Sequence, residues 1–155
     1  MAVTTLPLIT DSLQATIAAV TPTWKGDVDK FVLVDDMNSA RLEEFGGASG
    51  LERVFQVGTG DGHEGSIQHP GAGEWVQQFI VEIYYPRVAN MATLRRQIMQ
   101  DFMDVKKALD DPANWIATTV FHQHVPDEQP EIIVARKAYI RQINVVVQAM
   151  LARST

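Results

Sequence analysis

The chain has 155 residues, of which 46% are hydrophobic and 21% are charged, a balance typical of one globular domain. It contains no cysteine, which excludes disulfide bonds, thiol catalysis and cysteine-based zinc sites. The formal net charge of −6 argues against a free nucleic-acid-binding domain, which normally carries a basic patch. We expect neither a signal peptide nor a membrane span, since no run of about 18 apolar residues occurs.

Apolar residues near the N-terminus recur with a helical period. Their spacings of 3, 4, 4 and 3 predict an amphipathic helix over Leu6–Val20. Thr5 is suited to cap this helix, and Pro7 is tolerated in its first turn. Further along, Lys30–Val34 is a short apolar run typical of a strand, and Ser39–Phe45 has room for one or two helical turns.

The strongest strand pattern is Trp75–Tyr85. Five of its six odd positions are large and apolar, so we expect one face of this strand to be buried. Pro86 ends the pattern, and the shorter run Arg53–Val57 is expected to pair with it in a hairpin. Between the two runs, residues 58–74 contain six glycines and predict a long, flexible loop.

A second amphipathic helix is predicted over Met91–Leu109, with Asn90 as its cap and Pro112 preventing its extension. Strand patterns follow at Trp115–Val125, at Glu131–Val134 and in the alternating segment Lys137–Met150, where a helix is the alternative. This order predicts a single α+β domain over residues 1–155. It would hold a mainly antiparallel sheet with a long-looped hairpin, covered on one face by two amphipathic helices.

Residues with catalytic or metal-binding chemistry are sparse. His122 and His124 would point the same way from a strand, and zinc could use such a pair with a third ligand from the loop, namely His63, His69, Glu64 or Asp61. Two partly exposed strand histidines are the simpler interpretation. The glycine-rich segment lacks the Lys and Ser/Thr of a phosphate-binding loop, and no nucleophile motif occurs. We therefore expect no cofactor, no metal and no enzymatic activity.

Contact with another protein is the more natural use of the hairpin. The even positions of Trp75–Tyr85 mix polar and apolar residues more than a solvated face requires. A loop of this length is usually functional or disordered. The candidate interface residues come from the loop and from this strand: Gly60, Asp61, His63, Glu64, His69, Ile80, Glu82 and Tyr84.

Taken together, the chain resembles the tail terminator (tail completion) proteins of long-tailed bacteriophages. The resemblance covers the helix Leu6–Val20, the strand-loop-strand Arg53–Tyr85 that ends in Tyr-Tyr-Pro, the helix Met91–Leu109 and the final strands through Met150. It is one of architecture, and the segment Trp24–Phe45 departs from it.

The resemblance implies a structural protein of the virion, assembled in the host cytoplasm. Such proteins form a ring, typically a hexamer, at the head-proximal end of the tail, where the ring stops polymerisation of the tail tube and joins the head–tail connector. DNA would pass through the lumen without specific binding, which suits an acidic protein. Another neck or connector protein is the alternative within virions, and a small metal-dependent enzyme using His122 and His124 is the alternative outside them.

Overall fold

The computed structural model describes residues 4–24, 31–33, 53–86, 91–114, 121–124, 132–134 and 138–152. The predicted α+β class is confirmed: the described residues form helices α1 and α3, a short 3-10 helix η1 and strands that join one sheet. The helices span Leu6–Ala18 (α1), Met91–Asp110 (α3) and Pro112–Asn114 (η1). The strands span Val32–Leu33 (β1), Val54–His69 (β2), Ala72–Pro86 (β3), Phe121–His124 (β4), Ile132–Val134 (β5) and Ala138–Ala152 (β6).

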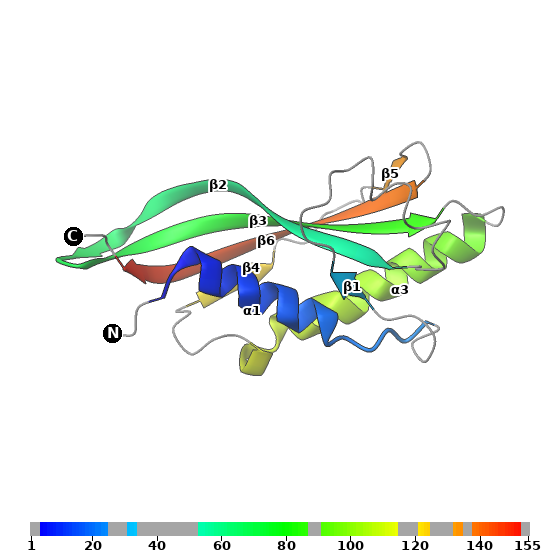
Figure 1. Ribbon diagram of the computed structural model, residues 1–155, viewed down its shortest axis with the longest axis horizontal. Helices are drawn as coiled ribbons and strands as arrows, with labels where there is room; N and C mark the ends of the chain where they lie inside the picture. The colour runs from blue at the N-terminus through cyan, green and yellow to red at the C-terminus, as the bar shows by residue number, and fades with distance from the viewer. Residues whose placement is uncertain are drawn as a thin grey trace.

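Strands β3 and β6 form the centre of the sheet, whose order is β1-β2-β3-β6-β4, with β5 also paired to β6 (Figure 1). β1 pairs with β2 in parallel, and the other four pairs are antiparallel. β3 and β6 stay in register over their whole length, from Ala72 opposite Ala152 to Pro86 opposite Ala138. The helix alternative for Lys137–Met150 is therefore wrong, because every residue from Ala138 to Met150 pairs with a residue of β3.

Both helices form where the sequence pattern predicts them. The hydroxyl of Thr5 accepts a hydrogen bond from the Leu8 N–H and caps α1, with Pro7 in the first turn. The buried residues of α1 and α3 join one hydrophobic core with alternate residues of β3 and β6, such as Phe79 and Val145. The odd positions of β3 supply the core as predicted: Phe79, Val81, Ile83 and Tyr85 are fully buried.

The prediction of a flexible loop over residues 58–74 is wrong. β2 continues as a strand to His69, a tight turn follows at Pro70 and Gly71, and β3 begins at Ala72. Gly71 has a φ of 81°, a conformation that favours glycine. The pairing of β2 with β3 contains two irregularities, between Thr59 and Gly62 and between Glu64 and Gln68.

Several of the remaining glycines have a packing role in the strand. A Cβ on Gly60 would lie 2.7 Å from Oε1 of Gln78, and one on Gly62 would lie 2.8 Å from the Trp75 ring. Long side chains of β3 therefore lean across β2, and the glycines of β2 make room for them. A high glycine content that would loosen an isolated segment is here compatible with a strand, because β3 is itself held in place by β6.

The other expected elements are shorter than predicted or lie outside the described residues. The strand expected over Lys30–Val34 consists of β1, which pairs with Val54 and Phe55 of β2. Of Trp115–Val125 the structure describes β4. The cap at Asn90 and the helical turns at Ser39–Phe45 lie outside the described residues. None of the helices in the described ranges is long and apolar enough to cross a bilayer.

Candidate interaction surface

The end of the β2–β3 hairpin projects past the start of α1, at one extremity of the molecule, and forms an arm (Figure 1). We define the hairpin arm as residues 58–69 of β2 and 72–80 of β3. Four predicted interface residues, Asp61, His63, Glu64 and His69, are exposed on its β2 side, and Gly60 is half-buried beside Gln78. The structure thus places these five residues on one strand, although they were expected in a loop.

One edge of β2 is open over most of its length. β1 pairs with β2 only at Val54 and Phe55, and no strand in the described part of the chain pairs with this edge from Gln56 to His69. An edge strand presents backbone N–H and C=O groups that can pair with another chain. Lysine, arginine and proline, which commonly protect such edges, do not occur within Val54–His69, although Asp61, Glu64 and the two pairing irregularities do.

The sheet face opposite the hydrophobic core is rich in amide side chains. We call it the outer sheet face and define it by half-buried residues of three strands: Gln56, Gln78, Ile80, Glu82, Gln142, Asn144, Val146 and Gln148. The register brings Ile80 opposite Asn144 and Glu82 opposite Gln142. The β6 members were absent from the predicted interface, yet the alternation of Lys137–Met150 had already placed them on one side of that strand.

Hydrogen bonds connect the polar groups of this face. The Nε2 of Gln56 donates to Oε1 of Glu82 over 3.1 Å, and Nε2 of Gln142 donates to Oε2 of Glu82 over 3.5 Å. Farther along, Nε2 of Gln148 donates to Oε1 of Glu74 over 2.6 Å. Each carboxylate is therefore bound by neutral amides, and the face carries no cation. Such a surface can exchange hydrogen bonds with a partner and still offer apolar area at Ile80 and Val146.

Tyr84 does not belong to this exposed set, contrary to the sequence prediction. Its side chain is 0% exposed and lies between Val54 of β2 and Ile140 of β6, which are also buried. At this end of β3, consecutive residues Ile83 and Tyr84 are both buried, so the sheet is covered on both faces. Alternation alone could not distinguish a half-exposed strand from one that becomes fully buried at one end.

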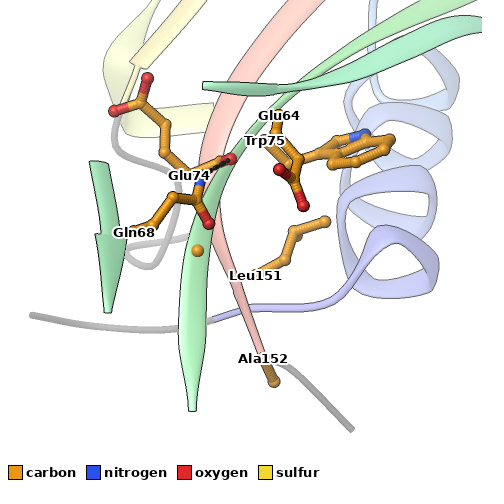
Figure 2. A pocket seen from close by; sticks show the side chains of 7 residues that line it. Glu64, Gln68, Glu74, Trp75, Leu151 and Ala152 are labelled. Atoms are coloured by element: carbon orange, nitrogen blue, oxygen red, sulfur yellow. Dashed lines mark hydrogen bonds between the residues drawn. The ribbon is translucent and has the colours of Figure 1, made fainter. Parts of the chain in front are cut away.

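A hollow of about 200 Å³ lies at the end of the arm and is lined partly by Glu64, Glu74, Trp75 and Leu151 (Figure 2). Glu64 lies beside its strand partner Trp75, whereas the side chain of Glu74 reaches to the other side of β3. The two carboxylates therefore do not converge on one point. In the described ranges, no three His, Cys, Asp or Glu residues gather as a metal site would require.

The structure does not unite the histidines proposed as metal ligands. His63 pairs with Val76 in the arm, and His69 pairs with Ala72 beside the turn. His122 and His124 pair with Val147 and Val145 of β6, and their side chains lie outside the described residues.

A buried polar cluster escaped the sequence analysis. Asp101 of α3 accepts hydrogen bonds at Oδ2 from Nε of Arg53 over 2.7 Å and from the Tyr85 hydroxyl over 2.8 Å. All three side chains are fully buried, and Arg53 also donates to the backbone oxygen of Trp24. Asp101 lies three residues after Ile98 and four before Val105, so the helical period could have placed it on the buried side of α3.

Burial dominates the electrostatics of this cluster. It raises the pKa of Asp101 above its ordinary value, although the hydrogen bond and charge of Arg53 act in the opposite direction. Burial, together with the charge and hydrogen bond of Asp101, raises the pKa of Tyr85 well above its ordinary value. Tyr85 therefore remains a neutral donor. The cluster fixes α3 against β2 and β3, which suits a positioning role for the sheet rather than exposure to a partner.

Arg141 of β6 is buried as well. Its guanidinium carbon lies 4.4 Å from the centre of the Phe102 ring, a cation–π contact within the protein.

Three features can thus meet another molecule: the open edge of β2, the outer sheet face and the exposed end of the hairpin arm. All three belong to the hairpin and its neighbour β6. Comparison with the sequence models of known protein families gives no match, and comparison with curated proteins finds no similar sequence.

Proposed function

We propose that the protein is a structural virion subunit, a tail terminator that forms a ring at the head-proximal end of a bacteriophage tail. The ring would stop polymerisation of the tail tube and provide the surface that joins the head–tail connector. The observation that carries this proposal is the long edge of β2 that no described strand pairs with, beside an outer sheet face whose defining residues include no cation. Both are features of a subunit whose sheet meets a neighbour.

A closed ring requires one patch on each subunit to meet a different patch on the next. In our proposal the sheet is mainly antiparallel and both helices cover the same face of it, which leaves the outer sheet face for such a contact. Ile80 and Glu82 lie on this face, at the centre of the sheet, and are assigned to the subunit interface. Their half-burial in the single chain leaves apolar and polar area for a partner.

The hairpin arm takes the role that the sequence analysis gave to a loop, a contact with the tail tube or the connector. A paired strand has less freedom than a glycine-rich loop, so the arm would bind with a smaller loss of conformational entropy. The net charge of −6 would let DNA pass through the lumen without adhering to it. In this function the protein requires no cofactor and no membrane.

Electron microscopy of virus particles that lack this protein tests the proposal. Overlong tails, or tails without heads, are the expected result. Tails of normal length that fail to join would favour the alternative of another neck or connector protein. Particles of normal length and full infectivity would overturn both. Size-exclusion chromatography with light scattering is the companion measurement, and a discrete hexamer is expected in the presence of tail tubes.

A further inference from the structure

Two methionines form an apolar stripe on the solvent side of α3. Met99 is 60% exposed and Met103 57%, and one helical turn separates them. Arg96 precedes them and Lys107 follows them on the same side of the helix, and both cations are exposed. We call these four residues the methionine stripe. An apolar centre with a cation at each end is unusual for a helix face that meets only water.

The stripe borders a hollow. Trp24, Arg96, Met99, Gln100 and Met103 line a depression of about 300 Å³, and a second depression of about 700 Å³ shares Gln100 and Met103 with it. Methionine side chains are flexible and polarisable, so they adapt to an inserted apolar group.

Some of the charged side chains around this groove have a hydrogen-bond or ion-pair partner within the described ranges, and others do not. Asp104 accepts hydrogen bonds from the backbone and the hydroxyl of Thr23, and Asp110 binds Lys106 over 2.6 Å. Arg96 and Lys107 have no such partner within the described ranges. The groove therefore has cations available for an acidic ligand and apolar surface between them.

The end of the hairpin arm has the complementary character. Ile67 is 43% exposed there, and Asp61 and Glu64 are exposed on the same strand. No lysine or arginine occurs anywhere in the segment Val54–Pro86. A large exposed apolar side chain on a strand that carries acidic but no basic side chains is complementary to a groove with exposed methionines and cations.

The two surfaces cannot satisfy each other within one molecule. The arm ends at one extremity of the long axis of the protein, whereas α3 begins at the other (Figure 1). Contact between two methionine stripes would bring like charges together. Contact between an arm and a stripe of different copies is heterologous, the kind of contact that builds a ring.

We propose that the end of the hairpin arm of one copy docks in the methionine groove of the next copy. Ile67 inserts between Met99 and Met103, and Glu64 of the arm approaches Arg96. The proposal rests on the proposed ring and identifies one of its subunit contacts.

Engineered cysteines test this contact directly, because the natural chain has none. The full-length double variant Ile67→Cys/Met99→Cys, assembled and then oxidised, is expected to form a series of disulfide-linked multimers. Each single variant is expected to form no multimer larger than a dimer, because it has one cysteine per chain. Ile67→Cys/Leu8→Cys is the matched control, since Leu8 is also exposed but lies on α1, outside the groove. Equal cross-linking of the control, or none in the Met99 pair, would overturn the proposal.

A charge exchange provides the second test. Glu64→Arg or Arg96→Glu alone should weaken self-association about three- to fivefold at low salt, and the double variant should restore it. Met103→Asp should weaken association at least tenfold, with circular dichroism confirming that the variant is folded. The contact would be refuted if the double charge variant associated no more tightly than the single variants and Met103→Asp associated as tightly as the wild type.

The results also separate this proposal from the ring itself. A discrete ring without the Ile67–Met99 disulfide would refute the contact and leave the ring intact. Disulfide-linked open chains without a closed ring would support the contact and count against the terminator function. A protein that neither assembles nor cross-links at any concentration, with or without tail tubes, would overturn both.

Discussion

Removal of the Asp101 carboxylate is expected to cost more stability than any other change of a single charge on α3. The side chain is fully buried and binds both Arg53 and Tyr85. Asp101→Ala removes the carboxylate that binds Nε of the buried Arg53 guanidinium, and removal of one member of a buried ion pair typically costs about 3–5 kcal/mol. Because small proteins are stable by about 5–15 kcal/mol, the variant should lie close to the limit of folding.

Urea unfolding followed by circular dichroism measures this cost. With a slope of about 2 kcal/mol per molar urea, the midpoint should fall by about 2 M. Asp110→Ala on the same helix is the matched control, since Asp110 binds Lys106 over a similar distance but is exposed. Its expected loss is below about 0.5 kcal/mol. The contrast between two aspartates of one helix isolates the effect of burial.

A second variant tests the cause of the loss. Arg53→Met/Asp101→Leu removes both charges and keeps the volume, so it should be more stable than Asp101→Ala, although it leaves the Tyr85 hydroxyl unpaired. A loss below about 1 kcal/mol in Asp101→Ala would show that the buried pair does not stabilise the fold. A double variant less stable than Asp101→Ala would show that the cost does not come from breaking the buried ion pair.

Three further outcomes are expected. Gly62→Ala should lower the free energy of unfolding in urea by about 1–3 kcal/mol, because the new Cβ meets the Trp75 ring. Gly58→Ala is the control and should be neutral, since its Cβ would lie 3.9 Å from a backbone oxygen. Equal losses in the two variants would refute the packing role of Gly62. The raised pKa of Tyr85 means that the folded state holds the hydroxyl proton more firmly than the unfolded state does. The free energy of unfolding should therefore fall as the pH rises above 10, and it should fall less in Tyr85→Phe. Identical pH profiles of the two proteins would contradict this. Ile80→Asp should give a folded monomer that no longer assembles in light scattering, and wholesale unfolding would instead assign Ile80 to the core.

The sequence predicted those elements whose pattern is local. The apolar stripes of α1 and α3 and the alternation of β3 depend on each element's own residues, and their bounds agree with the structure to within two residues at most ends. The strand character of residues 58–69 was missed because it depends on β3 and β6, which follow later in the chain. The six glycines of residues 58–74 are a valid signal of freedom in an isolated segment, but a neighbouring strand can remove that freedom by pairing.

The candidate site was predicted only in part for a related reason. Its β3 residues were recognised from alternation, but Tyr84 was wrongly included because burial on the second face depends on residues of β2 and β6 beside it. Asp101 was missed because the burial of a charged residue on an apolar helix face can be inferred only when its partners are known. Those partners, Arg53 and Tyr85, are distant in sequence.

The continuous pairing of β3 with β6 determines when this protein can fold during its synthesis. β6 follows the other described strands in the chain, and it is the neighbour that β3 needs along the whole arm, up to Ala152 beside the turn. Thr4, at the other end of the described chain, also binds this part of β6 through the backbone groups of Met150 and Ala152. A ribosome-bound chain without β6 therefore has a hairpin open on both edges. The arm becomes a completed sheet only after β6 has emerged from the ribosome, so a chain without β6 cannot present the finished surface to its partners.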